Sequence, residues 1–163
     1  MSYASTRSKS LKAASAFLPL LLAAACATHI AHAARDLFGV TVNDSKADVH
    51  AKLGAVGTLQ REESKRQEVW ELRDPRFRGA IVGYDAEWRV RFITAVAKEG
   101  GQPVRYADVL DVAAATHSVT GTSHNYRWQP PGAEIVIIAI GNDPERLTYV
   151  TLTKPNEPEA EDD

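Results

Sequence analysis

Between Gln67 and Lys154 the sequence alternates between short apolar segments and polar turns. The segments are rich in β-branched and aromatic residues, which favour strands. In several of them apolar and polar side chains alternate, as is typical of a strand with one buried face. The turns contain Gly, Pro, Asn and Asp and are short, so neighbouring strands are expected to pair antiparallel. The predicted strands are residues 67–72, 79–84, 88–96, 125–129, 134–140 and 147–154.

Two other segments carry helix signals. Residues 43–45 (Asn-Asp-Ser) supply side chains that can accept hydrogen bonds from the free backbone N–H groups of a first helical turn. Val49 and Leu53 follow four residues apart and would share one face. The sequence therefore predicts a short helix over residues 46–53. The apolar spacing over residues 103–115 predicts a second, longer helix.

The two halves of the chain resemble each other. Lys46 to Val49 matches Tyr106 to Val109, and matching strands follow in the same order at offsets of 54 to 60 residues. We therefore predict an α+β fold of two repeated units, each a short helix followed by a three-stranded antiparallel meander, with the helices packed on one face of the sheet. The units would span residues 34–98 and 99–154. The alternative is an α+β domain whose halves look alike by chance.

The first half also resembles a known fold. The predicted order is a capped helix that ends in Leu53-Gly54, a variable loop, and a meander with Trp70 in its first strand and Val90 to Ile93 in its third. This order is similar to the fold shared by two proteins. These are the small lipoprotein of the outer-membrane β-barrel assembly machine and the β-lactamase inhibitory protein, which carries two such units in tandem. The resemblance implies a fold and a tendency to bind other proteins, and no functional residue is carried over from it.

Residues 1–33 have the pattern of a secretory signal peptide. Arg7, Lys9 and Lys12 precede an apolar stretch, and Ala31 to Ala33 offers an A-x-A cleavage site. The apolar stretch of about 15 residues is shorter than the roughly 20 that a membrane span needs. We therefore expect a periplasmic or extracellular protein. The alternative is an uncleaved anchor helix.

Cys26, the single cysteine, lies within this segment. The residues before it loosely resemble a bacterial lipobox, in which the cysteine is lipidated and tethers the domain to a membrane surface. The alternative is that Cys26 is removed with the signal peptide. In either case no disulfide is expected within the domain, so its stability must come from packing.

The charge of the chain argues against nucleic-acid binding. Without residues 1–33 the chain has 16 basic and 21 acidic residues, a net charge of −5. Five of the acids lie in residues 155–163, which we predict to be a disordered acidic tail. Residues 34–153 have a net charge of −1 and lack the basic surface that nucleic-acid-binding proteins need.

The sequence contains no catalytic motif that we recognise. It has no cysteine after residue 33, no G-x-S-x-G and no phosphate-binding loop. His117 and His124 lie seven residues apart in a Ser/Thr-rich segment, and His50 stands alone on the first predicted helix. Neither pattern has the ligand spacing of a metal site. We therefore predict no enzymatic activity, no metal and no cofactor.

Aromatic and arginine side chains on or beside the predicted strands are the candidate binding residues. Both types are enriched at the centres of protein interfaces, and a sheet with helices on one face has its other face open. We hypothesise a non-enzymatic domain of the bacterial envelope that binds another envelope or extracellular protein through an open aromatic face. The alternatives are a carrier of a small ligand or lipid, with its pocket between helices and sheet, and a hydrolase with an unrecognised site. The candidate partner-binding residues are Trp70, Trp88, Arg89, Arg91, Arg127, Trp128 and Tyr149.

Overall fold

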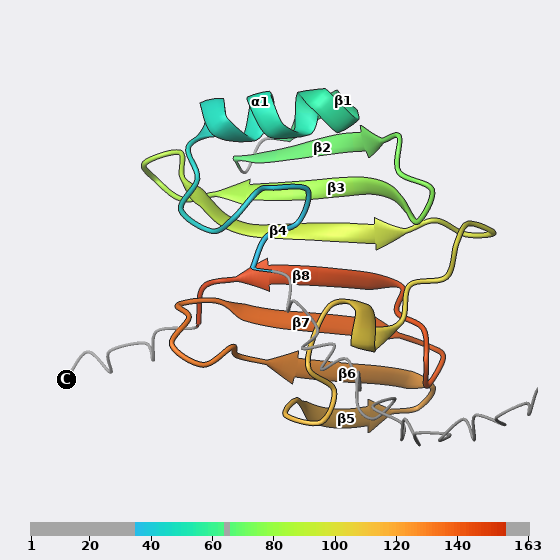
Figure 1. Ribbon diagram of the computed structural model, residues 1–163. Coiled ribbons are helices and arrows are strands. Elements are labelled where there is room, and N and C mark those ends of the chain that lie inside the picture. Colours follow the sequence, from blue (N-terminus) through green and yellow to red (C-terminus); the bar gives the residue numbers. More distant parts are fainter. Residues whose placement is uncertain (1–34, 64–65, 156–163) are drawn as a thin grey trace, which may run out of the picture.

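An eight-stranded antiparallel sheet is the framework of the computed structural model, which describes residues 35–63 and 66–155 (Figure 1). The strands are β1 (Gly57–Glu63), β2 (Gln67–Leu72), β3 (Phe77–Tyr84), β4 (Val90–Ala97), β5 (Thr116–Thr120), β6 (Ser123–Trp128), β7 (Val136–Gly141) and β8 (Tyr149–Thr153). They lie in the order β1-β2-β3-β4-β8-β7-β6-β5. The first four strands form one meander and the last four form a second. The two meanders join where β4 pairs with β8.

The helix α1 (Lys46–Val56) confirms the helix predicted over residues 46–53. Ser45 caps it: the Ser45 hydroxyl accepts a hydrogen bond from the backbone N–H of Asp48 at 3.2 Å, and the Asp48 carboxylate accepts one from the Ser45 hydroxyl at 2.6 Å. The hydrogen bonds that the Asp48 carboxylate accepts from the hydroxyl and the backbone N–H of Ser45 hold the pKa of Asp48 below its usual range. Val49 and Leu53 are fully buried beneath the helix. The helix continues past Gly54 and ends at Val56, with Gly57 as its C-cap.

The cap gives a direct test of this local structure. Replacing Ser45 with alanine removes the acceptor for the free N–H of Asp48 and is expected to lower the free energy of unfolding by about 1 kcal/mol. Ser45→Thr keeps the hydroxyl and is the matched control, with less than half of that loss. Urea unfolding followed by circular dichroism measures both. Equal losses for the two variants would contradict the role assigned to the cap.

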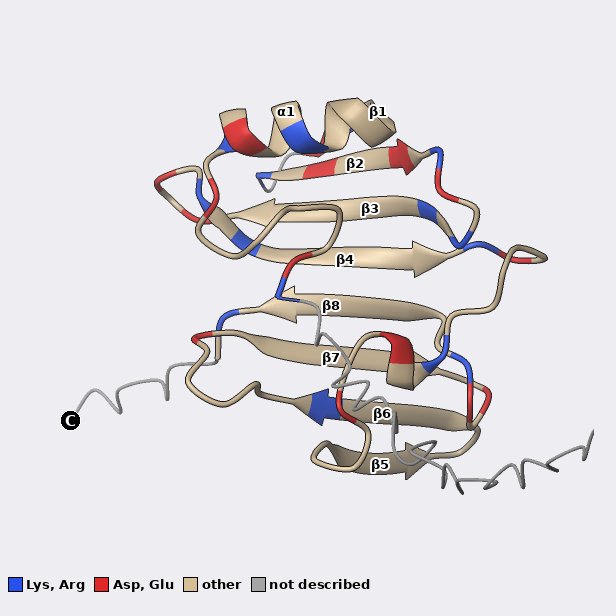
Figure 2. Ribbon diagram, viewed as in Figure 1, with Lys and Arg blue, Asp and Glu red and all other residues tan. Residues whose placement is uncertain are grey.

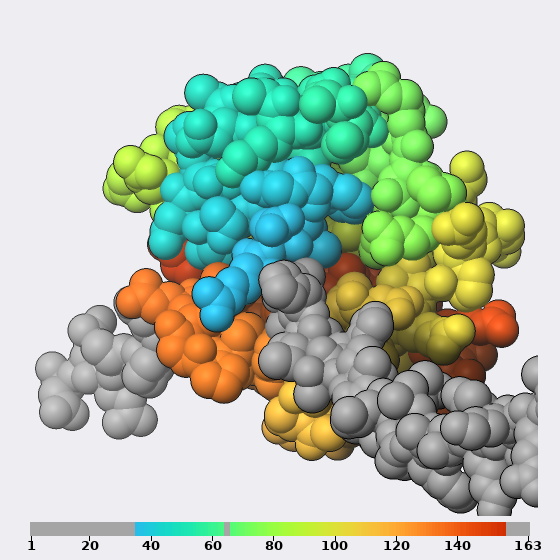
Figure 3. All heavy atoms as spheres, viewed as in Figure 1, coloured from blue at the N-terminus to red at the C-terminus, as the bar shows by residue number. Residues whose placement is uncertain are grey.

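One face of the sheet is covered. Residues 35–45 and α1 lie over the first meander, and residues 98–115 lie over the second, so both segments hide the sheet in the view of Figure 3. Beneath them Ile93 of β4, Leu152 of β8 and Ile137 of β7 are fully buried next to one another. The hydrophobic core therefore runs without interruption across the junction of the two meanders.

The prediction of two repeated units, each a helix followed by three strands, is wrong. Each half has four strands within one continuous sheet, and α1 is the single α-helix among the described residues. The segment predicted as a second helix, residues 103–115, contains only the 3-10 turn η1 (Tyr106–Asp108). Strands β1 and β5, which form the two edges of the sheet, are not among the strands that the sequence predicted. Polar and charged side chains are common on edge strands because they discourage another chain from pairing with the free backbone N–H and C=O groups of the edge.

Contacts distant in sequence prevent the second helix. The N–H of Leu147 donates to the carbonyl of Val104 at 3.0 Å, and the N–H of Tyr106 donates to the carbonyl of Glu145 at 3.4 Å, so this part of the segment is extended. Further on, the Asp111 carboxylate accepts hydrogen bonds from two following backbone N–H groups. Such side-chain acceptors compete with the hydrogen bonds of a helix.

The predicted signal peptide, Cys26 and most of the predicted acidic tail lie outside the described residues. Neither helical segment in the described part of the chain has the length and apolar character needed to span a bilayer.

Candidate functional site

The face of the sheet opposite α1 is open, because the described segments that cover the sheet lie on its other side (Figure 1). Strand register aligns a row of β-branched side chains across the middle of this open face. We call it the central row: Val69, Ile81, Thr94, Thr151 and Ile138, from β2, β3, β4, β8 and β7. Each of them is partly exposed. Arg61 of β1 and Arg127 of β6 extend the row at its two ends and are exposed.

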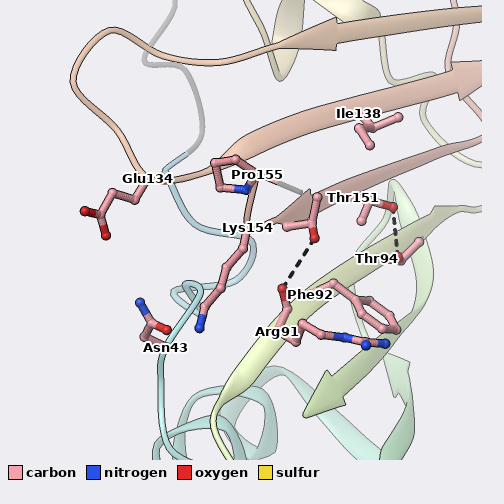
Figure 4. A pocket seen from close by; sticks show the side chains of 10 residues that line it. Asn43, Arg91, Phe92, Thr94, Glu134, Ile138, Thr151, Lys154 and Pro155 are labelled. Atoms are coloured by element: carbon pink, nitrogen blue, oxygen red, sulfur yellow. Dashed lines mark hydrogen bonds between the residues drawn. The ribbon is translucent and has the colours of Figure 1, made fainter. Parts of the chain in front are cut away.

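A groove of about 1080 Å³ lies on this face over β4, β8 and β7 (Figure 4). Three residues of the central row line it, and the hydroxyls of Thr94 and Thr151 are hydrogen-bonded to each other at 2.8 Å. Neither β7 nor β8 contains a charged residue, and the charged residues gather near strand ends, in loops and on α1 (Figure 2). The groove is therefore uncharged at its centre. Its lining residues are Asn43, Arg91, Phe92, Thr94, Glu134, Ile138, Thr151, Thr153, Lys154 and Pro155.

A glycine on the neighbouring strand positions the aromatic ring of the groove. Gly83 of β3 pairs with Phe92 of β4, and a Cβ atom at position 83 would collide with the Phe92 ring. The ring therefore lies against the backbone of β3. The Arg91 guanidinium lies 5.5 Å from the centre of this ring, within the range of a cation–π contact. The groove thus has an apolar wall with a positive charge beside it.

The rim of the groove is charged. Lys154 at the end of β8 lies 3.9 Å from the Asp85 carboxylate, whose pKa is held below its usual range chiefly by a hydrogen bond from the backbone N–H of Arg89. Glu134, in the loop before β7, adds a negative charge to a rim that otherwise carries Arg91 and Lys154.

A smaller hollow of about 160 Å³ lies on the same face over β5, β6 and β7, and it shares Ile138 with the groove.

The structure does not bring the seven candidate residues together. Trp70 and Trp128 are on the covered face with 4% and 8% of their surfaces exposed, so they belong to the core. The sequence pattern alone could not fix this, because alternation along a strand does not tell which of its two faces is covered. The open face is β-branched rather than aromatic at its centre, and this corrects the prediction of an open aromatic face.

The other five candidates lie in two places. Arg91, Arg127 and Tyr149 are on or beside the open face, and Arg91 lines the groove. Trp88 and Arg89 lie in the turn between β3 and β4, where Trp88 is 44% exposed. Three of the seven residues therefore lie near the groove.

A second polar cluster lies under α1, around Glu68. Glu68 is 1% exposed and is the single buried charged residue of the described chain. One of its oxygens, Oε2, accepts hydrogen bonds from the Tyr84 hydroxyl at 2.6 Å and the Trp70 indole N–H at 3.2 Å. The other, Oε1, lies 2.7 Å from Nε2 of His50 and 3.1 Å from Nζ of Lys46. The carboxylate is therefore paired at both oxygens.

The protonation of this cluster follows from its contacts. Burial alone would raise the pKa of Glu68, but hydrogen bonds from Tyr84, His50 and Lys46 outweigh burial and hold that pKa below its usual range. Burial and the hydrogen bond to Glu68 raise the pKa of Tyr84. A hydrogen bond to Glu62 is the main reason that the pKa of Lys46 is raised. At neutral pH Glu68 is therefore a carboxylate, Lys46 an ammonium group and Tyr84 a neutral phenol.

Sequence reasoning missed this cluster because His50 and Glu68 are 18 residues apart. One signal was available: Glu68 and Trp70 are two residues apart in a predicted strand, so they share a face. Had Trp70 been assigned to the core, Glu68 would have followed it there as a buried charge that needs partners.

Comparisons with known proteins identify a similar fold and no family. No protein-family model and no curated protein match the sequence. The crystal structure of a DUF4309 family protein from Bacillus subtilis is 17% identical, covers 72% of this chain and 83% of its own, and has a TM-score of 0.50. An extracellular protein with an SCP domain from Bacillus anthracis is 13% identical, with a TM-score of 0.41. That match covers 69% of this chain, which spans 44% of the second protein.

Proposed function

We propose that this chain is an exported, non-enzymatic domain that binds another protein through the open face of its sheet. The groove over β4, β8 and β7 is the observation that carries this proposal. Export rests on the signal-peptide pattern of residues 1–33. The partner is an envelope or extracellular protein.

The shape and chemistry of the open face support a protein partner. The five side chains of the central row cover four strand spacings, a length of about 19 Å that suits an extended peptide segment. Interfaces between proteins combine an apolar centre with a polar rim, and arginine is enriched in them. The central row has this arrangement, with Arg61 and Arg127 at its ends and Arg91 at the rim of the groove.

The lining of the groove suits binding more than catalysis. None of its ten lining residues is a histidine or a cysteine. The hydroxyls of Thr94 and Thr151 are hydrogen-bonded to each other. The lining residues that could act as a base, Glu134 and Lys154, point away from this pair in Figure 4.

Site-specific photo-crosslinking tests this proposal. A photoreactive phenylalanine analogue replaces Thr151 in the full-length protein, which is produced with a C-terminal tag in a Gram-negative host. The control places the same analogue at Val112, which is 38% exposed in the segment that covers the other face. We expect one dominant protein to be crosslinked from position 151 and not from position 112.

A second change in the same experiment tests the face itself. Ile138→Asp puts a charge on the apolar floor of the groove and is expected to reduce the crosslinked product about tenfold, a loss of about 1.4 kcal/mol in binding. Val119→Asp, on exposed β5, is the matched control and should leave the yield unchanged. Equal yields from positions 151 and 112, or no effect of Ile138→Asp in a folded variant, would contradict a partner on the open face.

A carrier of a small ligand is the second candidate, because the volume of the groove is close to the upper end of the range of ligand pockets, roughly 300–1,000 Å³. The groove lies on the open face, whereas the sequence had suggested a pocket between helices and sheet. Native mass spectrometry of the protein purified from its host would favour this candidate if it detected a small molecule that Ile138→Asp removes.

A further inference from the structure

Three metal-ligating side chains converge under α1, on the opposite side of the sheet from the groove. A ring nitrogen of His50 and carboxylate oxygens of Glu62 and Glu68 all lie within 4.8 Å of one another. His50 comes from α1, and Glu62 and Glu68 are directly paired across β1 and β2. One imidazole and two carboxylates form a donor set that zinc accepts, with a fourth position left for water.

Two of these donors are already held in place. The Oε2 atom of Glu68 is occupied by Tyr84 and Trp70, which directs Oε1 toward His50. The imidazole of His50 is packed edge-on against Trp70, with 5.3 Å between ring centres and 84° between ring planes. Hydrogen-bonded neighbours orient metal ligands in the same way in known metal sites. The third donor, Glu62, is 58% exposed and therefore has room to move.

A cation already lies between the two carboxylates. The Lys46 ammonium group is 3.0 Å from Oε1 of Glu62 and 3.1 Å from Oε1 of Glu68. Lys46 is the first residue of α1 and its side chain is 29% exposed, so its ammonium group can swing out toward solvent. The exposed Trp88 ring lies 4.9 Å from this ammonium group.

We propose that His50, Glu62 and Glu68 bind a divalent transition-metal ion of the zinc class, and that the Lys46 ammonium group occupies this position when the metal is not bound. Metal binding would displace the ammonium group. The Nε2 atom of His50 would release to solvent the proton that it donates to Glu68, and the bound imidazole would carry its proton on Nδ1. The Nε2 atom of His50 and Oε1 of Glu68, now 2.7 Å apart, would separate to about 3.3 Å, the spacing of two ligands around tetrahedral zinc. This site is independent of the partner-binding groove.

Zinc titration of the purified, chelator-treated protein tests the proposal, with isothermal titration calorimetry at pH 7.5 as the readout. We expect one zinc ion per chain. His50→Ala removes a ligand and should weaken binding at least about tenfold. Lys46→Met removes the competing positive charge and should tighten binding by about tenfold. A purely structural role for the cluster predicts no tightening in Lys46→Met.

A second histidine pair provides the control. Nε2 of His117 lies 3.2 Å from Nδ1 of His124 at the β5 edge, where both rings could also attract zinc. His117→Ala should leave the affinity and the stoichiometry of the proposed site unchanged. Near-ultraviolet circular dichroism confirms that each variant is folded. Loss of zinc binding in His117→Ala, or no zinc binding by either the wild type or a folded Lys46→Met variant, would overturn the proposal.

Discussion

Replacing Glu68 with leucine is expected to lower the free energy of unfolding by about 3 kcal/mol, because it leaves buried donors without an acceptor. Leucine has a similar volume, so little of this loss comes from a cavity. The Tyr84 hydroxyl and the Trp70 indole N–H would lose the oxygen that they share, in side chains that are each 4% exposed. Lys46 would keep its ion pair with Glu62 and could also be hydrated, so the loss of Glu68 as a partner of Lys46 should contribute little to the destabilisation.

Glu68→Gln is the matched control for this variant. The glutamine oxygen can still accept hydrogen bonds from Tyr84 and Trp70, whereas its amide group faces Lys46 without a charge. We expect a loss of about 1 kcal/mol, well below that of the leucine variant. Urea unfolding at pH 7, followed by tryptophan fluorescence, measures both. A Glu68→Leu variant as stable as the wild type would show that the buried network contributes nothing to stability.

The advantage of wild type over Glu68→Gln should also depend on pH. The pKa of Glu68 is lower in the folded protein than its ordinary value, so the folded state binds fewer protons at this site than the unfolded state. Such a group stabilises the fold above its unfolded pKa, and the benefit is lost as the pH falls through its folded pKa. The difference in the free energy of unfolding between wild type and Glu68→Gln should therefore have its full size at pH 7 and become smaller below about pH 4. A difference that stays constant down to pH 3 would contradict the assignment.

Local patterns predicted those elements whose structure depends on nearby residues. The bounds of β2 match the predicted 67–72, and the cap at Ser45 followed from the residue types around it. The second predicted helix failed because Val104 and Arg105 are held extended by partners about 40 residues later in the chain, from Glu145 to Leu147. No pattern within residues 103–115 reports those partners.

Local sequence patterns could not predict the groove, for a similar reason. Its floor depends on the pairing of β4 with β8, which brings together Thr94 and Thr151, 57 residues apart. Of the seven candidate residues, Arg91 alone lines it. The sequence did not show that Trp70 and Trp128 belong to the core, because large aromatic side chains occur both in interfaces and in cores. Only the register and the covering of the sheet decide between the two.

The junction of the two meanders is expected to be the most sensitive part of the core. Leu152 of β8 is fully buried and is paired with Ile93 of β4 on one side and Ile137 of β7 on the other, both also fully buried. Leu152→Ala would leave a cavity shared by both halves, and we expect a loss of about 3–4 kcal/mol in the free energy of unfolding. Urea unfolding measures this loss.

The neighbouring residue on the same strand provides the control. Thr151 faces the groove, is partly exposed and makes a hydrogen bond to Thr94, so Thr151→Ala should cost about 1 kcal/mol or less. Equal losses at positions 151 and 152 would contradict the assignment of the covered and open faces.

Hydrogen exchange then tests whether the two meanders unfold together. If the core at β4 and β8 makes the sheet one cooperative unit, Leu152→Ala should lower the free energy of opening of backbone amides equally in β3 and in β7. In both strands the decrease should match the loss in the free energy of unfolding. These strands belong to different meanders and flank the junction on its two sides. A loss of protection in β7 with β3 unchanged would show instead that the first meander, with α1 and the Glu68 cluster, is stable without the second. The groove, which needs β4, β8 and β7, would then open without loss of the proposed metal site.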